Sequence, residues 1–110
     1  FQPHLYSRTR DLHREFGASL ALADWVVVTD VYGAREEPIP GVTGQLVASA
    51  ARRAGAPWVQ YLPHRADVAA RVAELAAPGD MVVVMGAGDI TLTASELAQA
   101  LQPQMAEGSA

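Results

Sequence analysis

Three short apolar runs, none of which alternates with polar residues, constrain the fold more than any other feature of the chain. They span residues 25–28, 58–62 and 81–85, and they are rich in valine, with tryptophan at the start of two of them. Unbroken runs of this length are typical of strands that are buried on both faces in a parallel sheet. The sequence therefore predicts three central strands of one parallel sheet.

Helix patterns lie between these runs, with apolar residues recurring every three or four positions. They predict a first helix that closes near Ala23, a second from about Thr43 to Gly55, a third that ends at Pro78 and a fourth after Thr93. Helices and strands that alternate through right-handed crossovers indicate a three-layer, Rossmann-like α/β domain with a mostly parallel sheet. Phe1 resembles the end of a further strand, so we expect the first strand to be truncated at the N-terminus.

Polar residues near the expected helix starts indicate how these helices begin. Ser7 or Thr9 is a candidate N-cap for the first helix, and His64 is a candidate cap for the third. Thr93 and Glu96 have the spacing of a capping box for the fourth helix.

Length, charge and composition exclude several classes of protein. A chain of 110 residues is one domain that can bury a continuous core, which we place at residues 1–101, with residues 102–110 as a flexible tail. The net charge of −4 argues against nucleic-acid binding, which needs a basic face, and no apolar run is long enough to span a bilayer. The chain has no cysteine, which suits the cytoplasm. It has neither an initiator methionine nor a signal peptide pattern, so we expect a piece of a longer protein.

Unusual polar residues follow each predicted strand, whereas the connections that lead into the strands are short and consist mostly of small or apolar residues. These polar segments are residues 2–8, 29–41, 62–64 and 86–89. In an open parallel sheet, ligands bind outside the carboxyl ends of the strands, because the connections there vary without disturbing the core. The asymmetry predicts a binding site at that rim.

The first of these segments, together with the two residues after it, contains a histidine, a tyrosine and two arginines. His4 is either a satisfied loop histidine or a ligand contact, and Tyr6 either covers the core edge or positions a substrate. Arg8 and Arg10 lie in the first turn of the predicted helix, where cations oppose the helix dipole. This unfavourable placement indicates an anionic ligand.

The later segments leave more alternatives open. Asp30 follows a predicted strand, where an aspartate accepts from a ligand hydroxyl, holds a metal or caps a turn, while residues 35–37 indicate a solvated loop. Gly86, Ala87, Gly88 and Asp89 resemble half of a dinucleotide fingerprint without its third glycine. Its glycines still allow backbone amides to approach a ligand closely. The sequence has no histidine pair at metal spacing, no nucleophile elbow and no P-loop, and we assign no catalytic or metal-ligating residue.

Three segments resemble the carboxy-terminal domain of the Mur ligases. They are FQPHLYSRTRDL, DVYGAREEPIPG and MGAGDIT, and the resemblance runs from Phe1 to about Leu101. It is strongest to the branch of the family that joins L-alanine to UDP-N-acetylmuramate. A leucine, Leu5, stands where that branch commonly has an arginine.

The resemblance implies an activity and a set of ligands. Mur ligases of this branch use ATP, with Mg2+, to phosphorylate the lactyl carboxylate of UDP-N-acetylmuramate, and the amine of L-alanine then attacks in peptidoglycan synthesis. An amino-terminal domain and a central domain, both outside this chain, would hold the sugar nucleotide, the ATP and the Mg2+, so the chain alone is expected to be inactive.

The resemblance also implies roles for individual residues. It places His4, Tyr6 and Arg8 at the substrate, with the turn of Gly86, Ala87, Gly88 and Asp89 facing the same ligand. Asp30 is a further candidate, for the nucleotide cofactor, because of its place directly after a predicted strand and not because of the resemblance.

Two other functions stay open at this point. A ligase that attaches a whole murein tripeptide shares the fold, but its loop usually departs from the Tyr-Ser-Arg of residues 6–8. A non-catalytic nucleotide-binding module is the alternative from another class. A receiver-like module is disfavoured, because the chain has no lysine.

Overall fold

The computed structural model describes residues 1–109 of the chain, with side chains described for residues 1–102. It has a small parallel sheet of two strands, β1 (Trp25–Val28) and β2 (Trp58–Tyr61), in which Trp25 pairs with Trp58 and Val28 with Tyr61. Both strands lie within apolar runs that predicted them. The α/β class is therefore confirmed for the part of the chain that is described.

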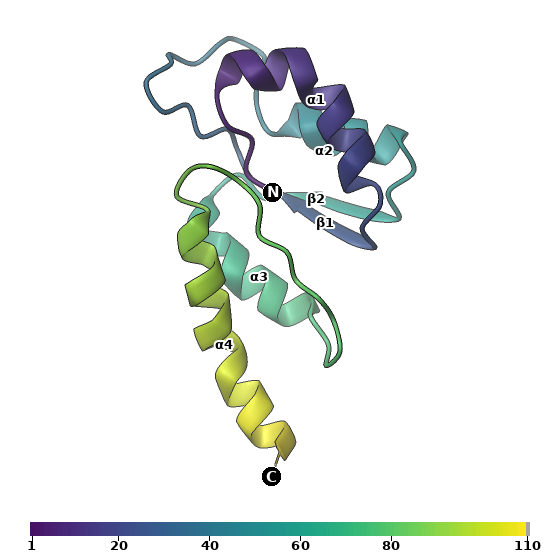
Figure 1. The fold of residues 1–110 in the computed structure, drawn as a ribbon, viewed down its shortest axis with the longest axis vertical. Coiled ribbons are helices and arrows are strands. Elements are labelled where there is room, and N and C mark those ends of the chain that lie inside the picture. Colours follow the sequence, from purple (N-terminus) through teal and green to yellow (C-terminus); the bar gives the residue numbers. More distant parts are fainter. Residues whose placement is uncertain (110) are drawn as a thin grey trace.

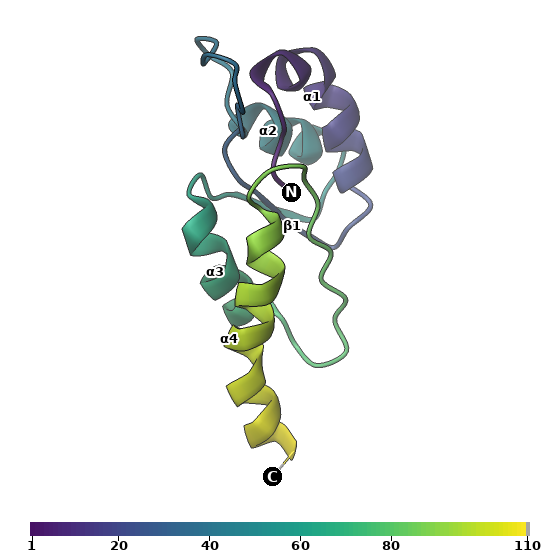
Figure 2. The same ribbon diagram turned by 60° about the vertical axis from the view of Figure 1, so that its left-hand side comes forward.

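Helices lie on both sides of this pair of strands. Along the chain they are α1 (Tyr6–Leu20), α2 (Gln45–Arg53), the short 3-10 helix η1 (Arg65–Asp67), α3 (Val68–Leu75) and α4 (Thr91–Ser109). Helices α1 and α2 lie on one side of β1 and β2, and α3 and α4 lie on the other (Figure 1). Turning the molecule shows the same separation of the two helix pairs (Figure 2).

The first core lies between α1, α2 and the sheet, and small residues let the two helices approach closely. A Cβ atom added to Gly17 of α1 would lie 2.4 Å from the Cβ of Ala50 in α2. The rings of Phe1 and Phe16 pack at 5.4 Å between centroids beside this core. Its buried members are Leu20, Val26, Val28, Val47, Ala48 and Ala51.

The second core joins α3 to α4 and is a separate cluster. Ala69 and Ala73 of α3 and Leu97 of α4 are its buried members, and Val72 packs against them. The two cores are separate clusters of buried residues. This is unusual, because helices on the two faces of a parallel sheet normally pack against the same strands.

The prediction of a third strand at residues 81–85 is wrong for this structure. The segment has no strand pairing, and 88% of Met81 and 63% of Val83 are exposed to solvent. Its backbone receives one hydrogen bond at its end, from the Gln2 amide to the Met85 carbonyl (3.0 Å). A strand needs a neighbour along its length, and this segment has a neighbour at one end only.

The expected helix caps also differ from those observed. Helix α1 begins at Tyr6, ahead of Ser7 and Thr9, and its N-cap residue is Leu5. His64 precedes η1 without a capping hydrogen bond from its side chain.

The fourth helix begins before the predicted capping box. Helix α4 starts at Thr91, and both Thr93 and Glu96 bind the guanidinium of Arg65 instead. It continues beyond Leu101, and the flexible tail expected over residues 102–110 stays a prediction. Among residues 1–109, no helix combines the length and the apolar character that crossing a bilayer requires.

Candidate functional site

The segment before α1 and the loop after β1 run side by side. His4 forms a parallel bridge with Tyr32, in which the Tyr32 amide donates to the Pro3 carbonyl (2.8 Å) and the Leu5 amide donates to the Tyr32 carbonyl (2.9 Å). The rings of His4 and Tyr32 stack with centroids 6.0 Å apart and planes inclined by 16°. These contacts fix the position of His4 at the end of the sheet.

Gln2 joins this segment to the glycine turn. Its side-chain amide donates to Oδ1 of Asp89 (2.7 Å), and its Oε1 accepts from the backbone amide of Ile90 (3.2 Å). Gln2 is 5% exposed, and its bond to the Ile90 amide is buried, whereas the side chain of Asp89 is partly open to solvent. Sequence reasoning missed this residue. The available signal was a polar amide side chain directly after the end of an expected strand.

The glycines of the turn pack against aromatic and aliphatic side chains of the same rim. A Cβ atom at Gly88 would lie 2.5 Å from Cγ of Tyr32, and one at Gly86 would lie 2.5 Å from Cγ2 of Ile90. Ala87 lies between them and is exposed. The contact of Gly88 with Tyr32, which itself stacks on His4, places the histidine segment and the glycine turn at one rim of the sheet.

Nδ1 of His4 is buried and has no hydrogen-bond partner among the described residues. Nearly all buried polar atoms in folded proteins are paired, and an unpaired one is costly. The described residues offer this nitrogen no partner, so both interpretations of His4, as a satisfied loop histidine and as a ligand contact, stay predictions. A ligand or a water molecule is the partner that such an atom requires.

The N-terminus of α1 is capped from a distant loop. Oε1 of Glu36 accepts the backbone amide of Ser7 (3.0 Å), and its other oxygen accepts the Ser7 hydroxyl. These bonds to Ser7 hold the pKa of the Glu36 carboxyl below its ordinary value. The solvated loop expected at residues 35–37 is thus incorrect for Glu36, because it supplies the helix cap that Ser7 and Thr9 do not.

Tyr6 and Arg8 lie in the first turn of this helix. The ring of Tyr6 packs on Gly33, where an added Cβ would meet Cε2 of Tyr6 at 2.4 Å. Arg8 is exposed, and it has no hydrogen bond or ion pair with any residue that the structure describes. Arg10, by contrast, pairs with Asp11 (2.9 Å). Of these two arginines, Arg8 is the one without a side-chain partner among the described residues.

Asp30 has a structural role in the turn before α2. Its Oδ1 accepts the backbone amides of Val31 (2.8 Å) and Gly44 (3.1 Å). Burial, followed by the negative charge of Asp30, raises the pKa of the Tyr61 hydroxyl. The observed bonds match the turn interpretation that the sequence left open, and a cofactor contact by Asp30 stays a prediction.

Arg65 of η1 contacts the glycine turn of residues 86–89. Nε of Arg65 lies 3.4 Å from Oδ2 of Asp89, and its guanidinium also binds Glu96 of α4. Asp89 is thus held by Gln2 on one oxygen and by Arg65 near the other. Within residues 1–102, no three histidine, cysteine, aspartate or glutamate side chains gather in a way that would hold a metal ion.

Comparison with known proteins gives consistent relatives. Residues 2–88 match the family described as Mur ligase, glutamate ligase domain. The chain is 56% identical to the UDP-N-acetylmuramate--L-alanine ligase of Mycobacteroides abscessus, over 93% of this chain and 20% of the relative. It is 52% identical to the enzyme of that name from Cutibacterium acnes, over 93% of this chain and 21% of the relative. It is 54% identical to the enzyme of that name from Nocardia farcinica, over 98% of this chain and 21% of the relative.

The chain therefore spans about a fifth of the length of the curated relatives that it matches. The family match covers residues 2–88 of 110, and the three segments that resembled the Mur ligases all lie in or next to that range. The chain belongs to the Mur ligase family and represents its glutamate ligase domain.

Proposed function

We propose that this chain is the C-terminal, amino-acid-binding domain of a longer ATP-dependent ligase that joins L-alanine to the lactyl carboxylate of UDP-N-acetylmuramate in peptidoglycan synthesis. The names of the relatives support the substrate pair. The observation that carries the proposal is the shared rim, where Gly88 packs on Tyr32 and Tyr32 stacks on His4. In the longer enzyme this domain is proposed to close over the reactants, and the enzyme is proposed to be cytoplasmic.

His4 and Arg8 are the proposed contacts for the substrate anion. The unpaired Nδ1 of His4 supplies one polar contact, and the exposed guanidinium of Arg8 suits a bidentate contact with a carboxylate. Tyr6 is proposed to position the substrate, and the amides of Gly86, Ala87 and Gly88 to face a ligand oxygen beside Asp89. These residues bind and orient the reactants, and none of them is assigned to proton transfer.

ATP and Mg2+ are the proposed cofactors of the longer enzyme, but the residues present do not make a site for either. The sequence has no P-loop motif and no lysine, and the carboxylates of Asp30 and Asp89 are engaged by backbone amides and by Gln2. The proposal therefore assigns ATP and Mg2+ to a domain outside this chain. That domain and a sugar-nucleotide-binding domain are the proposed partners.

The domain itself is proposed to occupy residues 1–101 and to be a three-layer, Rossmann-like unit when complete. The placement of α1 and α2 on one side of the strands, and of α3 and α4 on the other, supports this. The parallel pairing of β1 with β2 supports it as well.

The test is a substitution of Arg8 in the full-length enzyme. Arg8→Ala should raise the Michaelis constant for L-alanine by about tenfold to a hundredfold, because a charged hydrogen bond contributes about 1.5–3 kcal/mol, and should change that for ATP much less. Arg14→Ala is the matched control, since Arg14 is exposed on the same helix and lines a shallow pocket with Arg53 instead. Equal effects on the two Michaelis constants, or no effect, would refute the role of Arg8.

The same assay separates the alternatives. Turnover with L-alanine but not with a murein tripeptide supports the proposal, and the reverse preference would assign the chain to the tripeptide ligases. Tight nucleotide binding by the isolated chain, measured by calorimetry, would favour the nucleotide-binding module instead.

A further inference from the structure

The guanidinium of Arg65 joins three parts of the molecule beside the glycine turn of residues 86–89. Arg65 begins η1, which follows the carboxyl end of β2. Its Nε lies 3.4 Å from Oδ2 of Asp89 in the turn, while its Nη1 binds the carboxylate of Glu96 in α4 and lies 3.4 Å from Oγ1 of Thr93. The side chain of Arg65 is only 20% exposed, so this arginine is held by its neighbours and is not a freely solvated surface charge.

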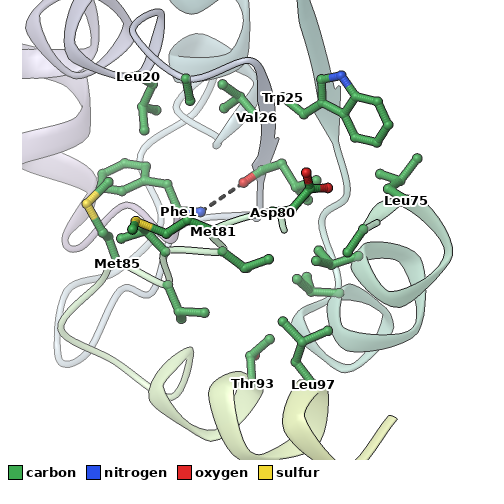
Figure 3. A pocket seen from close by; sticks show the side chains of 18 of the residues that line it. Phe1, Leu20, Trp25, Val26, Leu75, Asp80, Met81, Met85, Thr93 and Leu97 are labelled. Carbon is green, nitrogen blue, oxygen red and sulfur yellow. Dashed lines mark hydrogen bonds between the residues drawn. The ribbon is translucent and has the colours of Figure 1, made fainter. Parts of the chain in front are cut away.

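One side of this guanidinium faces the protein interior. Thr93 is 1% exposed, and it lies next to Leu97 on the face of α4 that lines a mainly apolar cavity (Figure 3). Water is therefore excluded from the Thr93 side of the guanidinium. Charges at a partly buried position interact more strongly than charges in bulk water, because the effective dielectric constant is lower. The charge of Arg65 therefore acts strongly on the carboxylates beside it.

The stability of α4 does not explain the position of Arg65. Helix α4 begins at Thr91, so Thr93 and Glu96 lie close to its N-terminal end. That end of a helix favours negative charge, and a cation there opposes the helix dipole. The two carboxylates explain the position instead, because Arg65 offsets one of the two negative charges that Asp89 and Glu96 carry together.

The same charges lie beside the backbone amides that are proposed to bind an anion. Asp89 directly follows Gly88, and its carboxylate is close enough to repel a ligand oxygen at the turn, since screening by 0.1 M salt needs about 10 Å. Without Arg65, the carboxylates of Asp89 and Glu96 would both be uncompensated. An anion at the amides of the turn would then be disfavoured.

We propose that Arg65 is a positioning residue that makes the glycine turn able to bind an anion. Its charge offsets those of Asp89 and Glu96, and its contact with Oδ2 of Asp89 holds the turn together with Gln2, which binds Oδ1. Arg65 acts through Asp89 and does not itself touch the ligand.

This inference rests on the proposed function, which supplies the anion. Gly88 packs on Tyr32 and Tyr32 stacks on His4, so the turn shares its rim with the proposed contacts for the substrate anion. The anion at the turn is therefore taken to be the carboxylate of L-alanine.

A purely structural role for Arg65 leads to different expectations. As a cross-link between η1 and α4, Arg65 would need the planar fork of a guanidinium, which lysine does not reproduce. As a compensating charge, it is replaceable by lysine, and its loss is offset when a neighbouring negative charge is removed. Substitutions that change charge and shape separately therefore distinguish the two roles.

The test measures Michaelis constants in the full-length enzyme. Arg65→Gln should raise the Michaelis constant for L-alanine by about tenfold and change that for ATP much less. Arg71→Gln is the matched control, because Arg71 is also paired with a carboxylate, that of Glu74 (3.0 Å). It lies over the ring of Trp58, the first residue of β2 and thus at the opposite end of that strand, so its loss should change neither constant. Equal constants for the native enzyme and Arg65→Gln would overturn the proposal.

Two further variants separate charge from shape. Arg65→Lys should keep the Michaelis constant for L-alanine within about threefold of the native value, because the positive charge stays. Combining Arg65→Gln with Asp89→Asn should restore that constant to the same range, because the asparagine oxygen still accepts from Gln2 and the negative charge is gone. A lysine variant as impaired as Arg65→Gln, or a double variant without recovery, would make Arg65 a structural cross-link and contradict the proposal.

Asp89→Asn alone decides the question if Arg65→Gln does not fold. With Arg65 in place, removal of the Asp89 charge should leave the Michaelis constant for L-alanine at or below its native value. A tenfold rise would instead assign the Asp89 carboxylate to the amino group of L-alanine, and would overturn the role of Arg65 as its compensating charge.

Failure of the proposed function is visible separately, because the native full-length enzyme would then show no turnover with L-alanine. In that case the 110-residue chain decides, with inorganic phosphate as the probe and the NMR shifts of the amides of Gly86, Ala87 and Gly88 as the signal. Phosphate binding that Arg65→Gln weakens by about tenfold, and that Arg71→Gln leaves unchanged, supports the proposal. Equal binding by the two variants, or no shift of these amides in the native chain, would refute it.

Discussion

The side chain of Gln2 donates to Oδ1 of Asp89 across 2.7 Å, although 87 positions separate the two residues in the sequence. This bond and the one from the Ile90 amide to Gln2 Oε1 connect the segment before α1 to the start of α4. They make Gln2 the residue that fixes the glycine turn relative to His4. The proposed binding rim therefore depends on a buried amide that does not itself face a ligand.

Gln2→Leu should lower the free energy of unfolding by about 1–3 kcal/mol, because the buried amide of Ile90 then loses its acceptor. Chemical denaturation of the chain measures this change. Gln99→Leu is the control, since Gln99 is exposed on α4. Equal stability of the Gln2 and Gln99 variants would show that the two bonds contribute nothing to the turn.

Gly88→Ala tests the packing of the turn on Tyr32. Gly88 does not have a positive φ, so its substitution adds no backbone strain, and the new Cβ would lie 2.5 Å from Cγ of Tyr32 and 2.7 Å from Oε1 of Gln2. Overpacking of this kind costs about 1–3 kcal/mol, and the loss in stability should be smaller when Tyr32 is also replaced by alanine. Gly41→Ala serves as the comparison, because Gly41 has a φ of 81° and open space around it. Its cost should be unaffected by Tyr32→Ala, and additivity of Gly88→Ala with Tyr32→Ala would contradict the contact.

The apolar runs predicted β1 and β2 because burial on both faces leaves a local pattern in the sequence. Residues 81–85 carry the same pattern, but whether they pair depends on a neighbour that the local sequence does not contain. The start of α1 was misplaced for a related reason. Its cap is Glu36, which lies 29 positions from Ser7, whereas capping rules examine adjacent residues.

The site, too, has features that a sequence rule predicts and features that depend on residues far apart in the chain. The rule that ligands bind at the carboxyl ends of parallel strands brought His4 and Gly88 to one rim, and the structure places them there through Tyr32. The contribution of Gln2 was not predictable in this way, because its partners Asp89 and Ile90 come from the far end of the chain.

Glu36→Gln should destabilise the chain at neutral pH and reduce its sensitivity to acid. The bonds from Ser7 lower the pKa of Glu36 in the folded state, so the unfolded state binds the proton more readily. The stabilisation by Glu36 is therefore complete above the ordinary pKa of 4.5 and is lost as the pH falls through the lower folded value. Thermal unfolding from pH 7 to pH 2 measures this, with Glu37→Gln as the exposed control. Parallel pH profiles for the native chain and Glu36→Gln would contradict the cap.

The amino group of Phe1 should make the stability of the 110-residue chain depend on pH between about 6 and 8. Burial lowers its pKa to about 6 in the folded state from 8.0, so the unfolded chain binds more protons in that window. The free energy of unfolding should therefore rise as the pH increases from 6 to 8, by at most about 3 kcal/mol, and stay low below pH 6. Chemical denaturation at several pH values measures the slope.

N-terminal acetylation is the control for this prediction, because it keeps an N–H donor for the Val27 carbonyl and removes the charge. All other titratable groups are the same in both chains, so the difference between the two slopes isolates Phe1. The acetylated chain should be the more stable one below pH 6, and the two chains should converge near pH 8. An acetylated chain with the same pH slope as the free chain would mean that the amine is solvated, which would contradict its burial beside the Val27 carbonyl.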